Sequence, residues 1–237
     1  PRLGPAMSLW LPPLALALST SPPVPMERLS ALFQATLPLQ EPALWSALQD
    51  PKGNMPSNRF GEIAANAHAA PSARHGMGAF ASVDLPVDAI ASLYPVHSLG
   101  LGSRRVSTEE DGEHFAEPCT TAYRTQLLHE EVQEWAPGAY IDANPHRDRL
   151  DGWLAHLAND GAVCSDEAGA LRYLEESALL CNCALLPLGT AAPLVALVTT
   201  RAVEQGEELL APYGVAHWVG QAGGAPPPPA ASDLPLS

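Results

Sequence analysis

The chain has 237 residues, enough for one domain with a substantial core and flanking extensions, and too few for two full-sized domains to be the first expectation. Its 26 acidic and 12 basic residues give a formal net charge of −14, which argues against direct nucleic-acid binding because phosphate contacts need clustered Lys and Arg. A basic protein partner fits this charge, although acidic runs also keep a fold soluble. No apolar run approaches the roughly 20 residues that span a bilayer, so no membrane association is expected.

Residues 1–57 are rich in Pro, Leu and Ala, and we expect them to form an N-terminal extension. The stretch from Leu9 to Leu18 resembles a weak secretory h-region or part of a transit peptide, and the sequence decides neither. Two short helices are predicted, over Met26 to Thr36 and Ala43 to Gln49, because apolar residues recur there at spacings of three and four. Each helix can lay one apolar face on a neighbouring core.

The middle of the chain consists mainly of short strand-like runs divided by Pro, Gly and Asp. One helix is predicted among them, over Leu171 to Leu180, with Glu175 and Glu176 facing outward. Pro187 to Pro193 is expected to connect the last two strands as a hairpin. The predicted strands are Gly78 to Val83, Ala89 to Tyr94, Thr121 to Leu128, Ala139 to Ile141, Asn182 to Leu188 and Leu194 to Thr200.

Beyond Trp218 the composition changes to a Gly pair, four consecutive prolines and small residues. Such a segment cannot bury enough apolar surface to order itself. Residues 219–237 are therefore predicted to form a disordered tail.

The four cysteines, Cys119, Cys164, Cys181 and Cys183, are too sparse for a disulfide-rich scaffold, so reduced thiols are expected. Cys181 and Cys183 have C-x-C spacing. A tetrahedral zinc site needs two further ligands, and the remaining cysteines are isolated, so no metal site is predicted.

A first motif is the glycine pair in Gly76-Met77-Gly78. Two glycines one residue apart let the backbone approach a ligand closely, although an ordinary glycine turn has the same composition. The segment lacks the third glycine of a dinucleotide fingerprint and the Gly-Lys-Ser/Thr of a phosphate loop. It therefore does not indicate binding of nucleotide phosphates.

A second motif, within Asp151 to Gly161, places His156, Asn159 and Asp160 among leucines and alanines. Buried polar groups must be hydrogen-bonded, and an Asn amide offers both a donor and an acceptor, which suits a purine edge or a backbone crossing. Taken alone, His156 fits a satisfied core histidine better than a catalytic base. A hydrolase using His156 with Asp160 is disfavoured, because no serine or cysteine lies in a recognisable nucleophile turn.

The most specific motif runs from Leu197 to Gly214 and reads Gly-Glu-Glu-Leu-Leu-Ala-Pro-Tyr-Gly from Gly206 onward. A strand and a glycine turn lead to Tyr213, which stands beside a glycine. Earlier in the chain, Asn182-Cys183-Ala184 opens the preceding strand.

In their order along the chain, these four segments resemble the SET domain of protein lysine methyltransferases, with its Gly-x-Gly, Asn-His-Ser, Asn-Cys and Gly-Glu-Glu-Leu…Tyr-Gly elements. On this resemblance the domain is assigned to residues 58–218. The resemblance implies a β-rich α+β fold of small β-sheets with a few short helices and a C-terminal pseudoknot, in which the Tyr segment threads beneath a loop.

The resemblance also implies an enzyme, a protein-lysine N-methyltransferase that transfers a methyl group from S-adenosyl-L-methionine to a lysine of a protein substrate. Gly76-Met77-Gly78, Asn159 and Asp160 would then lie at the cofactor, and Tyr213 would be the catalytic tyrosine. Trp218 would lie against the adenine ring, although plain core packing explains an aromatic residue there equally well.

Several positions depart from the family pattern. The usual His after the Asn is Asp160, and the Ser-Cys that commonly follows is Gly161-Ala162; both favour an alternative, a catalytically inactive SET-like module that binds a protein partner. The stretch between Asn159 and Asn182 is longer than in many members. No cysteine follows Trp218 to form the zinc cluster that often completes the substrate channel, so the N-terminal helices are expected to do so. The sequence names neither the substrate nor the compartment, and nucleus, cytoplasm and plastid are all compatible.

Overall fold

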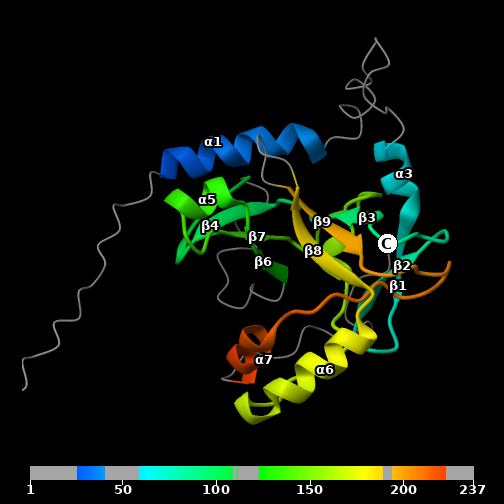
Figure 1. The fold of residues 1–237 in the computed structure, drawn as a ribbon. Helices are drawn as coiled ribbons and strands as arrows, with labels where there is room; N and C mark the ends of the chain where they lie inside the picture. The colour runs from blue at the N-terminus through cyan, green and yellow to red at the C-terminus, as the bar shows by residue number, and fades with distance from the viewer. Residues whose placement is uncertain (1–25, 41–58, 109–110, 112–122, 189–193, 223–237) are drawn as a thin grey trace, which may run out of the picture.

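A computed structural model describes residues 26–40, 59–108, 111, 123–188 and 194–222 of the chain (Figure 1). Its strands pair in small antiparallel sheets, and short helices lie around them (Figure 1). The architecture is thus a β-rich α+β fold, as the coarse fold class predicted.

The described strands form sheets of two, three and four strands. They are β1 (Ala67–Pro71), β2 (Met77–Ala81), β3 (Ile90–Leu93), β4 (Ser98–Leu101), β5 (Arg104–Ser107), β6 (Arg124–Gln126), β7 (Tyr140–Asp142), β8 (Cys183–Leu188) and β9 (Leu194–Thr199). The strand orders are β1-β2, β3-β9-β8 and β5-β4-β7-β6. Each predicted strand overlaps an observed one, whereas β1, β4 and β5 were not predicted. These three contain mainly Ala, Ser, Gly and Arg, so pairing within the fold, and not local propensity, makes them strands.

Helices cover the outside of these sheets (Figure 1). They are α1 (Met26–Thr36), α3 (Arg59–Asn66), α5 (Glu130–Trp135), α6 (Ala170–Leu180) and α7 (Val215–Ala222), with 3-10 turns η1 (Leu37–Gln40), η3 (Ala155–Leu157) and η4 (Glu167–Gly169). Helix α1 has the predicted bounds, and α6 begins one residue before its predicted start. Helix α7 continues past Trp218 to Ala222, four residues into the predicted tail. The predicted helix Ala43 to Gln49 and the stretch Leu9 to Leu18 lie outside the described residues.

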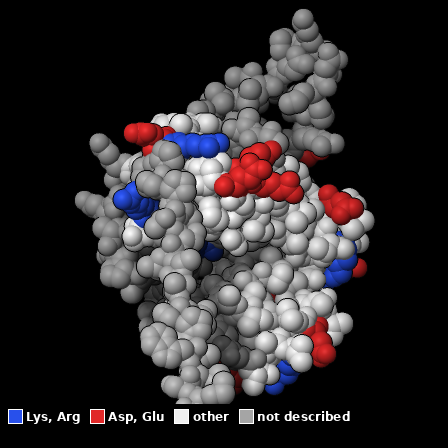
Figure 2. All heavy atoms as spheres, turned by 60° about the vertical axis from the view of Figure 1, so that its left-hand side comes forward, with Lys and Arg blue, Asp and Glu red and all other residues white. Residues whose placement is uncertain are grey.

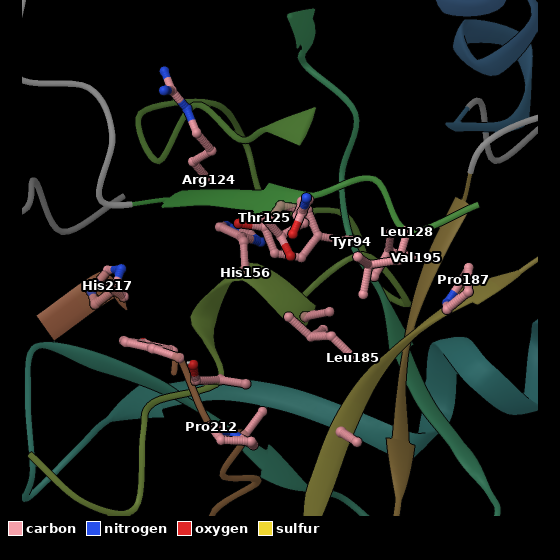
Figure 3. Close-up of a pocket in the computed structure, with 16 residues that line it drawn as sticks. Tyr94, Arg124, Thr125, Leu128, His156, Leu185, Pro187, Val195, Pro212 and His217 are labelled. Atoms are coloured by element: carbon pink, nitrogen blue, oxygen red, sulfur yellow. Dashed lines mark hydrogen bonds between the residues drawn. The ribbon is translucent and has the colours of Figure 1, made fainter. Parts of the chain in front are cut away.

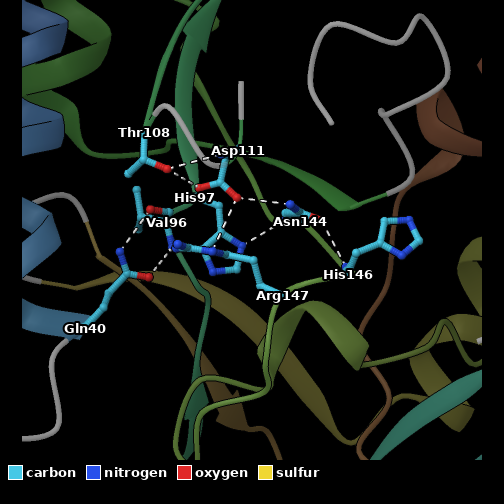
Figure 4. Close-up of polar contacts among 8 residues, drawn as sticks. All are labelled: Gln40, Val96, His97, Thr108, Asp111, Asn144, His146 and Arg147. Carbon is cyan, nitrogen blue, oxygen red and sulfur yellow. Dashed lines mark hydrogen bonds and ion pairs between the residues drawn. The ribbon is translucent and has the colours of Figure 1, made fainter. Parts of the chain in front are cut away.

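Helix α1 is part of the folded body. It packs on β4 and β5, and its Leu29 and Phe33 side chains are fully buried. Just after it, the Gln40 amide donates to the carbonyl oxygen of Val96 at 2.9 Å and accepts from the Val96 N–H at 2.9 Å (Figure 4). Helix α1 thus lays its apolar face on the core, as its spacing of apolar residues suggested, and residues 26–40 belong to the folded body.

The core contains buried side chains from several helices and strands. Phe33 of α1, Leu99 of β4, Ile141 of β7 and Leu197 of β9 are all fully buried, together with Leu209 near the C-terminus. Burying a Leu, Ile or Phe side chain contributes about 1.5–3 kcal/mol each. The C-terminal segment is thus held in part by the same apolar burial that holds the sheets.

A buried ion-pair cluster lies on the four-stranded sheet. The Asp142 side chain is fully buried, and one of its carboxylate oxygens contacts Arg124 at 3.0 Å and Arg105 at 3.3 Å. The Arg124 guanidinium stacks over the Tyr140 ring, 3.8 Å from its centroid. A side chain at Gly100 would collide with that ring, which explains the glycine in β4.

A second buried carboxylate, Asp111, ties three loops together (Figure 4). It accepts hydrogen bonds from the Thr108 hydroxyl at 2.8 Å and the Asn144 amide at 3.0 Å. The Arg147 guanidinium lies 3.5 Å from it. The Asn144 backbone N–H in turn donates to the His97 ring at 2.8 Å. Like Asp142, the Asp111 carboxylate therefore has an arginine as its counter-ion.

Helix α6 presents an unexpected face to the rest of the protein. Glu175 and Glu176 face solvent as predicted, but Leu171 and Leu179 are 76% and 80% exposed. The fully or nearly buried side chains of α6 are Tyr173 and Ser177. Tyr173 packs in an apolar cluster with Ala162 and Cys164, and the partner of its hydroxyl belongs to the site described below.

The face of the protein shown in Figure 2 carries no single dominant charge. Acidic and basic side chains form separate small groups on the face seen in Figure 2, and neither sign covers it. Among the described helices, none combines the length and apolar character needed to cross a bilayer.

Candidate functional site

The segment from Gly206 to Tyr213 runs antiparallel to β2. The Gly206 N–H donates to the Ala81 carbonyl at 2.8 Å, and the Ala81 N–H donates to the Glu207 carbonyl at 2.9 Å. The Leu209 N–H donates to the Ala79 carbonyl at 2.8 Å. These bonds attach the C-terminal segment to the strand that follows the glycine pair.

The same segment is also bonded to two further parts of the chain, Asn159 along the edge that faces β2 and Asn182 along the opposite edge. The Ala211 N–H donates to the Asn159 carbonyl at 2.9 Å. The fully buried Asn182 side chain accepts from the Leu210 N–H at 2.8 Å and donates to the Glu208 carbonyl at 2.8 Å. All four motif segments of the sequence therefore meet here. We call Gly76–Gly78, Asn159–Asp160, Asn182 and Glu207–Tyr213 the four-segment junction.

Asn159 fixes the glycine turn. Its amide nitrogen donates to the carbonyl oxygens of His75 at 3.0 Å and Met77 at 3.3 Å, and to the Glu208 carboxylate at 2.9 Å. A Cβ at Gly78 would lie 2.5 Å from that carboxylate, so any other residue there would displace the Glu208 side chain. The amide thus bonds to backbone carbonyls where two segments cross, which is one of the two uses predicted for it.

The Asp160 carboxylate accepts hydrogen bonds from several surrounding elements. One carboxylate oxygen accepts from the Tyr213 N–H at 2.8 Å, the Tyr173 hydroxyl at 2.6 Å and the Trp218 indole N–H at 3.0 Å. The other accepts from the Ala162 N–H at 3.1 Å. All four donors are uncharged. Asp160 is 8% exposed, so it is a buried acid satisfied by dipoles.

Close packing explains why residue 161 is a glycine. A Cβ there would lie 2.8 Å from the Cβ of Leu180 and 3.1 Å from the Cys181 sulfur. The glycine therefore lets the C-terminal end of α6 approach the Asn159–Asp160 turn closely. This departure from the family pattern accompanies the longer stretch that contains α6.

Tyr213 is anchored at both ends. Its backbone N–H donates to Asp160, and its hydroxyl donates to the Ala158 carbonyl at 3.0 Å. Its ring lies edge-to-face with His217, with centroids 4.8 Å apart, and stacks on Trp218 at 6.0 Å. Burial, and after it the negative charge of Asp160, raises the pKa of the Tyr213 hydroxyl, which is therefore protonated at neutral pH.

A cavity of about 370 Å³ opens beside Tyr213 (Figure 3). Its wall is mainly apolar, with Leu185 and Val195 on one side, and the Arg124 side chain points away from it (Figure 3). The residues that line it are Tyr94, Arg124, Thr125, Gln126, Leu128, Ala155, His156, Ala158, Ala184, Leu185, Pro187, Val195, Ala211, Pro212, Tyr213 and His217. None of them belongs to α1, and the second predicted N-terminal helix lies outside the described residues, so the expectation that the N-terminal helices complete a substrate channel stays a prediction.

His156 is a neutral residue of this cavity. Burial, and after it the positive charges of His97 and Arg149, lowers its pKa to about 3. Its ring lies edge-on to the Tyr94 ring, with centroids 6.2 Å apart. Its Nδ1 atom is buried and has no hydrogen-bond partner among the described residues.

The predicted site residues Gly76, Met77, Gly78, Asn159, Asp160, Tyr213 and Trp218 all lie at or beside the junction. Sequence reasoning missed Tyr173 and Glu208, and it placed Asn182 in a motif segment without giving its side chain a role at the site. Glu208 stands inside the recognised Glu-Glu-Leu run, which was a signal for it. Tyr173 carried none, because it is one aromatic residue in a leucine-rich helix.

Cys164, Cys181 and Cys183 are free thiols, and Cys119 lies outside the described residues. In the part of the chain that the structure describes, no group of three or more His, Cys, Asp or Glu side chains is placed to hold a metal ion. Zinc independence stays a prediction.

Comparison with known proteins adds no family: no family model matches the chain, and no curated protein matches it significantly. The chemistry of the junction therefore has to be argued from its own residues.

Proposed function

We propose that this protein transfers a methyl group from S-adenosylmethionine to a lysine of a protein substrate, using a SET-type domain within residues 58–218. The observation that best supports this is the four-segment junction. Segments far apart in the sequence, chosen because their order resembles that family, meet around the strand-like run from Gly206 to Tyr213. This run is bonded on both sides, as a C-terminal segment threaded beneath a loop would be.

Cofactor binding is assigned to Gly76-Met77-Gly78, Asn159, Asp160 and Trp218. S-adenosylmethionine supplies an activated methyl group on a cationic sulfonium. The Asp160 carboxylate fits such a ligand, because its hydrogen-bond donors are uncharged and leave its negative charge uncancelled at close range. Trp218 contacts Asp160 and Tyr213, and its proposed position against adenine rests on the resemblance.

The substrate lysine is assigned to the cavity beside Tyr213. Its apolar wall suits an aliphatic chain, and the pKa of a free lysine, about 10.4, falls when burial and a nearby positive charge disfavour the ammonium. The amine would then attack in its neutral form. Because the Tyr213 hydroxyl donates its proton to Ala158, its oxygen keeps lone pairs that orient the amine. Positioning is the main catalytic device in this proposal.

A second candidate is a non-catalytic SET-like module that binds a protein partner. Two observations favour it. Asp160 stands where the family has a histidine, and the donors of the Asn159 amide are already used within the chain.

Calorimetric titration with S-adenosylmethionine separates the two candidates. We expect the full chain to bind the cofactor, and Asn159→Ala to weaken binding by about 1–3 kcal/mol because a buried hydrogen-bond centre is lost. Asn66→Ala is the matched control, since Asn66 donates to Ile90, a residue outside the junction. No heat and no thermal stabilisation at millimolar cofactor would rule out the enzyme.

Tyr213→Phe tests the catalytic assignment. Methyl transfer from radiolabelled cofactor to a panel of lysine-bearing proteins should fall about 100-fold, while cofactor affinity stays unchanged, because a hydroxyl that orients the nucleophile matters mainly in the transition state. The control is Tyr140→Phe, which removes a hydroxyl bonded to Gly102 on the four-stranded sheet. Equal rates in Tyr213→Phe and wild type would remove Tyr213 from the mechanism.

A further inference from the structure

Helix α6 belongs to the stretch that makes the segment between Asn159 and Asn182 long, and it contacts the junction through Tyr173. This side chain is 1% exposed. Its hydroxyl donates to Asp160 at 2.6 Å and accepts from the Gly214 N–H at 2.8 Å. One oxygen atom therefore connects α6 to both the Asn159–Asp160 turn and the C-terminal segment.

The Tyr173–Asp160 pair holds two consecutive backbone amides. Asp160 accepts from the Tyr213 N–H, and the Tyr173 hydroxyl accepts from the next N–H, that of Gly214. Gly214 has a φ of 87°, so the chain turns sharply directly after Tyr213. The start of the Tyr213 side chain is thus fixed by this pair, and its hydroxyl end is fixed by Ala158.

The orientation of α6 agrees with this role. A helix that serves only to cover a core buries its leucines, whereas α6 exposes Leu171, Leu174 and Leu179 and buries Tyr173. Burial, and after it the hydrogen bond to Asp160, raises the pKa of Tyr173 to about 12, so the phenol keeps its donor proton at neutral pH. The Tyr173 ring packs in an apolar cluster with Ala162 and Cys164, and its hydroxyl bonds to the junction, so this one side chain connects the helix to the site.

We propose that Tyr173 is a positioning residue, through which helix α6 sets the place of the Tyr213 ring and hydroxyl. This inference rests on the proposed methyl transfer for its effect on rate, but its geometric content is independent of it. Without the Tyr173 hydroxyl, the Gly214 N–H loses its partner and Asp160 loses its shortest hydrogen bond. Tyr213 would then sample orientations in which its hydroxyl leaves Ala158.

The test compares Tyr173→Phe with Leu174→Ala, an exposed neighbour on the same helix, in the full chain. For Tyr173→Phe we expect kcat to fall at least about tenfold while the KM for substrate stays within about twofold, because positioning acts in the transition state. Leu174→Ala should match wild type. A folded Tyr173→Phe with the kcat of wild type overturns the inference.

A spectroscopic experiment tests this inference independently of the proposed function. With 3-fluorotyrosine incorporated at position 213, Tyr173→Phe should shift or split the fluorine NMR resonance, and Leu174→Ala should leave it unchanged. If wild type transfers no methyl groups, the proposed function fails, and the resonance alone decides the inference. An unchanged resonance in Tyr173→Phe overturns it.

If Tyr173→Phe does not fold, tetrafluorotyrosine at position 173 keeps the ring and its oxygen. Its phenol loses the donor proton at a lower pH than tyrosine does. The fluorine resonance of residue 213, observed beside the ring fluorines of residue 173, should then show a pH-dependent shift that is absent from the chain with unmodified Tyr173, in which the neighbouring His217 is the titrating ring against residue 213. Identical pH profiles in the two proteins overturn the inference.

Discussion

Two buried aspartates show how differently two regions of this protein use a carboxylate. In the four-stranded sheet, Asp142 is neutralised by Arg105 and Arg124. At the four-segment junction, Asp160 is satisfied by uncharged N–H and O–H donors, among them Tyr173. An arginine pair cancels the charge, and losing one partner of the pair is costly, whereas directed dipoles fix positions and leave the negative charge in place.

Removing Asp142 is the harshest test of the arginine-paired region. Asp142→Ala should lower the free energy of unfolding by about 3 kcal/mol, because both guanidinium groups lose their buried partner. Urea denaturation measures this, with the exposed Asp148→Ala as control. Cofactor affinity per folded molecule should stay the same, and a parallel loss of affinity would show that the two regions are coupled.

A pH change should act on the cavity side of the molecule through His156. Its folded pKa of about 3 lies below the ordinary 6.5, so its contribution to stability is complete above about pH 6.5 and is lost as pH falls toward 3. Between pH 7 and 5 the unfolding free energy should drop by about 2 kcal/mol from this group.

His156→Leu is the matching variant for that measurement. It removes the titrating ring and keeps an apolar side chain in the cavity wall. Its unfolding free energy should lose about 2 kcal/mol less than that of wild type over the same pH interval. Parallel pH profiles would contradict the assignment of a neutral His156.

Gly78→Ala probes the close packing of the junction. The added methyl group would meet the Glu208 carboxylate at 2.5 Å and displace it from Asn159. We expect a loss of about 1–2 kcal/mol of stability, measured by urea denaturation. Gly169→Ala is the control, because the only neighbour of its added carbon is the Asp166 carboxylate at 3.3 Å. Equal losses would mean that Gly78 has no special packing role.

The smallest effect is expected on the outward face of α6. Leu179 is 80% exposed, so Leu179→Ala should change the unfolding free energy by less than about 0.5 kcal/mol. Thermal denaturation checks this. A loss above about 1 kcal/mol would indicate that this face is covered in solution.

The sequence predicted the elements better than their contacts. Periodicity located α1 and α6, and the alternation of apolar runs and turn residues located β8 and β9, because these signals are local. The Ala-rich β1 had no such signal, since its pairing with β2 makes it a strand. Apolar periodicity located α6 but did not reveal which of its apolar side chains is buried, since Tyr173 is buried whereas Leu171 and Leu179 are exposed.

At the site, too, the sequence identified residues better than it identified their contacts. Motif order identified Asn159, Asp160 and Tyr213, and the structure places them within hydrogen-bonding distance of shared partners. It could not identify Tyr173, whose partners Asp160 and Gly214 are neighbours only after folding. The departure at Gly161 was interpreted as functional loss, while the structure gives it a packing reason in the end of α6.

The threading of Gly206 to Tyr213 between partners from three earlier parts of the chain has a kinetic consequence. Contacts of such large sequence separation close late, because the intervening loops must lose their freedom first. During synthesis, the two-stranded and four-stranded sheets can form while this run is still within the ribosome, and the junction can form only after it emerges. A chain truncated before Gly206 would leave the partners of this run, including Asn159 and Asn182, with these hydrogen bonds unmade. The site can therefore assemble only after the end of the domain has been synthesised.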